Sequence, residues 1–346
     1  MDPLQVTGIP KAGPALKLTK QEWPKPAIVK GIYATGWIAG HPIWMPRLIR
    51  FIDETEVNAL VVDVKDDTGT LSFKLDVPLA NEIGASLKKI ADPVKLMDTL
   101  REHQIYPIAR IVVFKDPYLA AHKPEWAVKD IGGGLWKDRK GLAWVDPHNR
   151  AVWDYILAIA KEAIGLGFQE IQFDYVRFTS DGDLKRCVYP YSKGELRQDV
   201  IRDFLVYIKK ELAPYQVPVS ADIFGLTTSA PDDLGIGQQF EKIAGNVDIV
   251  CPMVYPSHYA PGSFGLKIPD LHPYETVYRG VRDALKRLEK IGKNDNHIRP
   301  WLQDFSLGNY YGRAQIQAQI KAAYDAGAKE WIFWNPSCRY STDKYN

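Results

Sequence analysis

The chain has few cysteines and no long apolar run, and each shortage excludes a class of protein. Cys187, Cys251 and Cys338 are an odd number without CxxC spacing, so they predict neither a zinc site nor a disulfide framework. Each is expected to be a small buried apolar side chain. The sequence contains no apolar run long enough for a transmembrane helix, so no transmembrane segment is predicted.

The charges are nearly balanced, with 44 Lys and Arg against 42 Asp and Glu and no basic cluster. This balance argues against nucleic acid as a partner. No GxGxxG or GxxxxGK[ST] motif follows an expected strand, which argues against a bound nucleotide. The segment Met1–Pro26 has five prolines and no apolar core of a signal peptide, so residues 1–28 are expected to form an extended arm.

Motifs for metal and covalent chemistry are also missing. His41, His122, His148 and His258 are scattered, without HxH or HExxH spacing, and no GxSxG occurs. No metal ligand set and no cofactor is therefore predicted. A metal site assembled from distant strand ends remains an alternative.

One segment that is present carries polar groups on alternate positions of an expected strand. Glu170, Gln172 and Asp174 share one face, while Ile171 and Phe173 lie on the other. A polar inner face is costly to bury without partners. The pattern therefore predicts a strand whose C-terminal end opens into a polar cleft.

Apolar strand-like runs alternate eight times with helical patterns, which predicts a single-domain (β/α)8 TIM barrel over residues 29–346. A doubly wound open sheet is the alternative. The expected strands are Val29–Trp37, Ala59–Lys65, Pro107–Phe114, Glu170–Arg177, Val217–Phe224, Val247–Val254, Arg299–Phe305 and Glu330–Asn335. The expected helices are Met45–Glu56, Pro93–Gln104, Ala151–Ile164, Lys193–Leu212, Gly237–Ala244, Tyr274–Ile291 and Arg313–Ala326.

Carboxylates gather at the C-terminal ends of these strands, where barrels place their active sites. Asp174 and Asp222 lie on neighbouring expected strands, which suits the two carboxyl groups that glycoside hydrolysis needs. Arg177 or Lys65 is expected to keep the nucleophile ionised. An Asp63–Lys65 ion pair on one strand face is the purely structural alternative. The ten tryptophans and eighteen tyrosines include rings that can stack on sugars.

Several motifs in this order resemble a bacterial family of glycoside hydrolase domains, from about Lys30 to Tyr340. They are Asp63–Gly69, Ile171–Phe178, Ser220–Gly225, Pro252–Tyr259 and Arg299–Phe305. The family is distantly similar to α-amylase-like barrels. That resemblance implies a nucleophile at Asp174, a general acid at Asp222 and a charge-stabilising carboxylate at Asp304. Two departures argue against amylase activity: Asp222 replaces the usual Glu, and Gln172 stands where such barrels carry Arg.

The predicted function is a glycosidase that cleaves a polysaccharide or oligosaccharide with Asp174, Asp222 and Asp304. The family resemblance implies an extracellular or cell-envelope location. A non-catalytic carbohydrate-binding barrel of the envelope and a metal-dependent polysaccharide hydrolase or deacetylase remain alternatives. The expected substrate-binding residues are Tyr33, Trp37, Asp63, Lys65, Arg110, Tyr175, Arg177, Tyr255, His258, Gln303 and Trp334.

Overall fold

The computed structural model describes residue 23 and residues 26–294 and 297–345 of the chain. Within them, parallel strands close into a barrel in the order β1-β2-β3-β5-β7-β8-β9-β10, and β10 pairs with β1. The predicted TIM barrel is confirmed. The open-sheet alternative is wrong, because an open sheet would leave β1 and β10 as unpaired edges. The barrel strands are β1 Lys30–Ala34, β2 Ala59–Lys65, β3 Tyr106–Val112, β5 Glu170–Asp174, β7 Val219–Phe224, β8 Ile249–Met253, β9 Trp301–Gln303 and β10 Trp331–Trp334.

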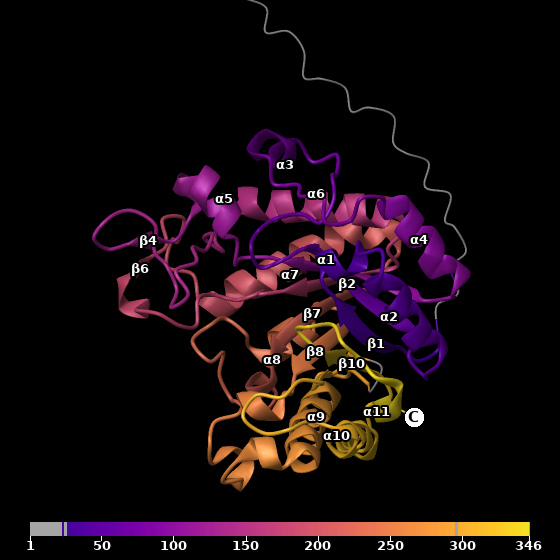
Figure 1. The fold of residues 1–346 in the computed structure, drawn as a ribbon. Helices are drawn as coiled ribbons and strands as arrows, with labels where there is room; N and C mark the ends of the chain where they lie inside the picture. Colours follow the sequence, from indigo (N-terminus) through magenta and orange to yellow (C-terminus); the bar gives the residue numbers. More distant parts are fainter. Residues whose placement is uncertain (1–22, 24–25, 295–296, 346) are drawn as a thin grey trace, which may run out of the picture.

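Helices surround the barrel (Figure 1), as crossover connections between parallel strands require. The expected arm over residues 1–28 falls largely outside the described residues, so its conformation stays a prediction. The helices are α1 Gly36–Ala39, α2 Trp44–Asp53, α3 Pro78–Ile83, α4 Pro93–Glu102, α5 Pro117–His122, α6 Arg150–Leu166, α7 Arg197–Leu212, α8 Phe240–Ala244, α9 Pro273–Lys290, α10 Arg313–Ala326 and α11 Thr342–Tyr345. None of the helices in the described part of the chain combines the length and apolarity that a membrane span would need.

The main core lies between the strands and this helix layer. Helix α6 is capped at its N-terminus by Asn149, whose side chain accepts a hydrogen bond from the Ala151 N–H. It is capped at its C-terminus by Gly167, with φ 122°. Helix α7 begins at Arg197, later than predicted. Leu196, within the predicted helix, precedes the observed one and is 60% exposed.

A short antiparallel pair, β4 Lys129–Asp130 with β6 Cys187–Val188, stands away from the barrel at the left of Figure 1. The sequence patterns did not predict it, because two-residue strands have no readable period. Cys187 on β6 is partly exposed, contrary to the expectation for the three cysteines, whereas Cys251 and Cys338 are buried.

Ion pairs fill the interior of the barrel at the N-terminal end of β5. The Arg299 guanidinium is fully buried and bonds Glu170 at 2.8 Å and Glu330 at 2.7 Å. Ser220 donates a further hydrogen bond to Glu170 at 2.6 Å. The first polar group on the inner face of β5 is therefore fully partnered, and only the C-terminal end of the strand is left for chemistry.

Candidate active site at the mouth of the barrel

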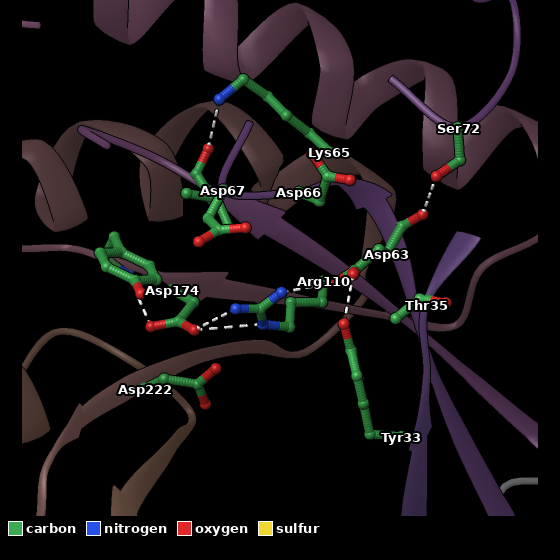
Figure 2. Close-up of polar contacts among 12 residues, drawn as sticks. Tyr33, Thr35, Asp63, Lys65, Asp66, Asp67, Ser72, Arg110, Asp174 and Asp222 are labelled. Atoms are coloured by element: carbon green, nitrogen blue, oxygen red, sulfur yellow. Dashed lines mark hydrogen bonds and ion pairs between the residues drawn. The ribbon is translucent and has the colours of Figure 1, made fainter. Parts of the chain in front are cut away.

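Strands β5 and β7 place Asp174 and Asp222 side by side at the C-terminal mouth. The two strands pair directly, with Phe173 opposite Ala221, so the next residue on each carries one of the two carboxyl groups. The predicted adjacency is confirmed, and Figure 2 shows the Asp222 carboxyl beside that of Asp174.

Arg110 of β3 lies between two carboxylates (Figure 2). Its Nε and Nη2 donate to Asp174 Oδ2 at 3.1 and 2.5 Å, and its Nη1 donates to Asp63 Oδ1 at 2.6 Å. The guanidinium is 4% exposed, so solvent screens these pairs little. The Tyr175 N–H adds a hydrogen bond to Asp174 Oδ1 at 2.5 Å. Asp174 is thus held as an oriented carboxylate.

Asp222 has the opposite electrostatic environment. Burial raises the pKa of Asp222 well above its usual range, and the Asp174 charge raises it further, although Arg110 and a hydrogen bond from Trp301 lower it. The Trp301 Nε1–H donates to Asp222 Oδ1 at 2.6 Å. The other carboxyl oxygen remains available for a proton. Burial and the Asp174 charge thus favour the protonated form of Asp222, whereas Arg110 binds Asp174 directly.

Tyr33, Asp63 and Trp334 form the wall opposite this pair. The Tyr33 hydroxyl donates to Asp63 Oδ2 at 2.5 Å, and its ring stacks on Trp334 with centroids 4.0 Å apart. Arg110 lies over both rings, at 5.6 and 5.2 Å from their centroids. These contacts tie three predicted binding residues into one rigid group around Arg110.

Asp63 gives a pH-dependent prediction for stability. Burial raises the pKa of Asp63 to about 6, although Arg110 and Tyr33 lower it. A carboxyl whose pKa is higher in the folded state contributes stability below about pH 4, and that contribution is lost as the pH rises through about 6. In Asp63→Asn this loss disappears. Its unfolding free energy relative to the wild type should therefore rise by up to about 3 kcal/mol between about pH 4 and pH 7.

Urea unfolding of both proteins at the two pH values measures this difference. The ion pair to Arg110 forms only when Asp63 is ionised, so its loss is already part of this pH-dependent difference, and only the change with pH is interpreted. A difference that stays constant with pH would contradict the assignment.

The prediction that Lys65 keeps the nucleophile ionised is wrong. A register shift between Asp63 and Lys65 redirects the lysine, which pairs with the buried carboxylate of Asp116 at 2.8 Å. The Asp63–Lys65 ion pair of the structural alternative is therefore also wrong. Arg177 makes no ion pair to Asp174 in the described chain, and Arg110 alone supplies that cation.

Of the remaining predicted binding residues, Tyr255 and His258 lie together, whereas Gln303 bonds the backbone. Burial raises the pKa of Tyr255, and the charges of Asp222 and Asp174 raise it further, which indicates that Tyr255 lies near the carboxyl pair. His258 and Phe305 pack against its ring, with centroids at 5.3 and 5.8 Å. The Gln303 side chain bonds two backbone groups: it accepts from the Ser257 N–H and donates to the carbonyl of Phe305.

Trp37 was predicted to bind substrate at the end of the first strand, and its observed position differs. The strand ends at Ala34, and the chain turns into α1, where Trp37 is 60% exposed. It is available as an outer contact and is not part of the inner wall. The Thr35 side chain caps this helix by accepting from the Ile38 N–H at 3.2 Å, which fixes the turn.

Asp304 was expected to be catalytic, but its contacts lie away from the carboxyl pair. It follows β9, on which Trp301 bonds Asp222, and alternation directs it to the opposite face. Its carboxylate accepts from Lys344 Nζ at 2.7 Å and from the Tyr345 hydroxyl at 3.1 Å. Asp304 therefore holds helix α11 against the barrel.

This arrangement predicts that Asp304→Asn changes stability more than rate. We expect the unfolding free energy to fall by about 1–3 kcal/mol, because Lys344 and Tyr345 lose a charged acceptor. Turnover of the folded variant should stay within about threefold of the wild type. Denaturant unfolding and an activity assay on the same preparation test this. A loss of turnover with unchanged stability would return Asp304 to the catalytic set.

A separate groove of about 690 Å³ lies outside the barrel between α2 and α4. Its lining includes Met45, Ile49 and Leu96, and it shares no residue with the carboxyl cluster. Because barrel active sites form at the C-terminal mouth, we place the candidate site at Asp174 and Asp222. Among the residues that the structure describes, no group of three or more His, Cys, Asp or Glu is arranged to hold a metal ion.

Sequence reasoning missed Trp301 as a site residue. Trp301 and Gln303 are two apart on one strand, so they share the inner face, and this alternation was readable. Tyr175 was predicted to bind substrate, but its φ of 52° was not predicted. That left-handed backbone turns the chain sharply after Asp174 and has no sequence signal here, because the residue is neither Gly nor Asn.

A closed (β/α)8 barrel with paired carboxyl groups at its C-terminal mouth has the architecture of a barrel glycosidase. The chain belongs to the family described as "Putative glycosyl hydrolase domain", whose profile matches residues 31–340. The resemblance stated from the motifs is thereby confirmed.

Solved structures agree with this fold. A hypothetical protein from Ruminiclostridium thermocellum ATCC 27405 is 38% identical, with 59% of this chain and 98% of that chain covered and a TM-score of 0.52. The PgaB (BpsB) glycoside hydrolase domain from Bordetella bronchiseptica is 12% identical over 92% and 99% of the chains, with a TM-score of 0.65. The spore cortex-lytic enzyme SleL from Bacillus cereus is 13% identical over 93% and 74%, with a TM-score of 0.54. A search of curated proteins found no match.

Proposed function

We propose that this chain is a glycosidase that cleaves a polysaccharide with Asp174 as nucleophile and Asp222 as general acid and base. The observation that carries the proposal is the pair of adjacent carboxyl groups with different partners. Arg110 binds the Asp174 carboxylate through two donors, while burial and the Asp174 charge raise the pKa of Asp222. Glycoside hydrolysis requires one acid of each kind.

In the proposed reaction, the proton of Asp222 passes to the glycosidic oxygen as the bond to the anomeric carbon breaks. The Asp174 carboxylate attacks the anomeric carbon and forms a glycosyl ester. Asp222, now ionised, takes a proton from water, and that water displaces the Asp174 carboxylate. The first step exchanges the charges of the two side chains and the second restores them, while Arg110 stays ion-paired to Asp63.

The aromatic side chains around the pair support a sugar substrate. Tyr255, His258 and Phe305 form a cluster at the ends of β8 and β9, and His258 is exposed. Such ring faces and edges pack against the C–H faces of sugars. Tyr33 and Trp334 close the other side of the site. We propose a polysaccharide of the bacterial envelope or matrix, and an extracellular or envelope location. A neighbour of similar fold is a spore cortex-lytic enzyme.

The test is release of new reducing ends from a panel of bacterial and plant polysaccharides by the wild-type chain. We expect cleavage of at least one polymer, with activity unchanged after exhaustive chelation. Sugar binding with no product at any enzyme concentration would instead favour a carbohydrate-binding barrel. Activity that chelation abolishes and added metal restores would favour a metal-dependent hydrolase or deacetylase.

A further inference from the structure

A buried cation without an anion lies directly beyond the carboxyl pair. Arg177 follows the turn at Tyr175 and is 6% exposed. Its guanidinium carbon lies 4.6 Å from the ring centroid of Phe224 and 4.9 Å from those of Trp144 and Tyr175. No carboxylate of the described residues forms an ion pair with it. Aromatic faces offset only part of the cost of removing a guanidinium from water.

One edge of this guanidinium is already used. Arg177 Nη1 donates to the Phe178 carbonyl at 3.0 Å and to Ser180 Oγ at 2.9 Å. Nε and Nη2 donate to none of the described residues. These two nitrogens form the edge of an arginine that binds a carboxylate through two parallel hydrogen bonds. The side chain is therefore held by one edge while its carboxylate-binding edge has no protein partner.

The acidic groups nearest Arg177 are engaged elsewhere. Asp138 accepts from the Trp144 Nε1–H at 3.2 Å and from two backbone N–H groups. Asp181 accepts from the Arg139 N–H at 3.1 Å, and Asp174 is paired with Arg110. None of them forms an ion pair with Arg177, although their charges partly offset the lowering of its pKa by burial.

A second cation also contacts the ring of Tyr175. Lys115 Nζ is 4.9 Å from the Tyr175 ring centroid and pairs with the half-exposed Asp67 at 2.9 Å. Tyr175 thus carries a cation at each of two contacts and adjoins Asp174 in the chain. A ligand group that reached Arg177 would lie next to the point where a sugar bond meets Asp174.

We propose that Arg177 is the carboxylate-binding subsite of the candidate active site, and that the substrate is a saccharide containing uronic acid residues. The Nε–Nη2 edge of Arg177 would take the sugar carboxylate, with Trp144, Tyr175 and Phe224 as the walls. This inference rests on the proposed function and narrows its substrate class. The planar Nε–Nη2 edge can bind a carboxylate or a phosphate through two parallel hydrogen bonds. We assign it to a carboxylate, and a comparison with sulfated oligosaccharides tests that choice.

The test is binding, measured by calorimetry on the Asp222→Asn chain so that no ligand is consumed. The probes are oligogalacturonides, hyaluronan oligosaccharides and oligomannuronates, each compared with its methyl-esterified form. We expect at least one acidic probe to bind at least about tenfold more tightly than its ester, as a charge-assisted bidentate contact implies. Adding Arg177→Gln should reduce that preference to within about twofold.

Arg139→Gln is the matched control, because it removes the same charge from an exposed position on a neighbouring loop. It should keep the preference. Arg177→Lys retains the charge without the planar edge, so it should also lose most of the preference, and it serves if Arg177→Gln does not fold.

Several results would overturn the proposal. They are equal affinity for every acid and its ester, no affinity for any acidic probe, equal losses in Arg139→Gln and Arg177→Gln, and tighter binding of sulfated oligosaccharides than of carboxylated ones. The binding readout needs no turnover. Acid-selective binding, together with no hydrolysis of any polymer by the wild-type chain, would therefore refute the glycosidase alone. Hydrolysis of neutral polymers without acid selectivity would refute this subsite alone.

Discussion

Asp222→Asn is expected to lower kcat on the polysaccharide substrate by about 10²–10⁴-fold, because the amide cannot protonate a leaving sugar. Asp222 is buried, and both burial and the Asp174 charge raise its pKa, which favours the protonated form that a general acid needs. Initial rates of reducing-end release measure the loss. The wild-type rate should also fall as the pH rises through the pKa of Asp222, and this alkaline decline should be absent in the variant.

The leaving group distinguishes a lost acid from a damaged site. A dinitrophenyl glycoside of the cleaved sugar needs no protonation, so the variant should retain its kcat/KM on that substrate to within about tenfold. Its kcat should still fall, because Asp222 also activates the water of the second step. An equal loss of kcat/KM on both substrates would contradict the assignment of Asp222 as the acid.

Asp174→Asn is expected to lower kcat by at least about 10³-fold on both substrates, because it removes the carboxylate that meets the developing positive charge. Asparagine keeps the shape of the side chain. Arg110 keeps Asp63 as an ion-pair partner, so the fold should survive. Kinetics on the two substrates, with circular dichroism to confirm folding, measure the effect.

Asp154→Asn is the matched control for this change. Asp154 lies on α6, where it accepts a hydrogen bond from the Tyr207 hydroxyl away from the barrel mouth. Its activity should remain within about twofold of the wild type. Full activity of Asp174→Asn on a substrate that the wild type cleaves would show that the nucleophile is another residue.

Much of the fold was predictable because each barrel strand is a short apolar run, and a segment with the apolar spacing of a helix follows it. Ala59–Lys65 was predicted at its observed bounds, and β5 was predicted to begin at Glu170. The same periodicity placed Asp174 and Asp222 at adjacent strand ends. Strand ends were predicted less accurately: β7, β8 and β9 each begin two residues later than predicted, and β1 and β5 each end three residues earlier. Trp37 and Arg177 both lie beyond those points.

The details of the site were less predictable, because they depend on local irregularities. A register shift in β2 sends Lys65 to Asp116, and nothing in the residue types marks that shift. Arg110 was recognised as a site residue, but its pairing with two carboxylates depends on which strands become neighbours. Asp304 was placed by family resemblance, whereas the alternation along β9 directs it away from Trp301 and Gln303.

The central claim is that Asp174 is ionised and Asp222 is protonated in the resting protein. The most direct test is the ¹³C resonance of labelled aspartate carboxyl groups between about pH 4 and about pH 8, assigned with Asp174→Asn and Asp222→Asn. We expect the Asp222 carboxyl to remain at the protonated shift at about pH 6, while that of Asp174 is at the ionised shift. Removing the Asp174 charge should lower the pKa of Asp222. Two ionised carboxyl groups at about pH 6 would contradict the account.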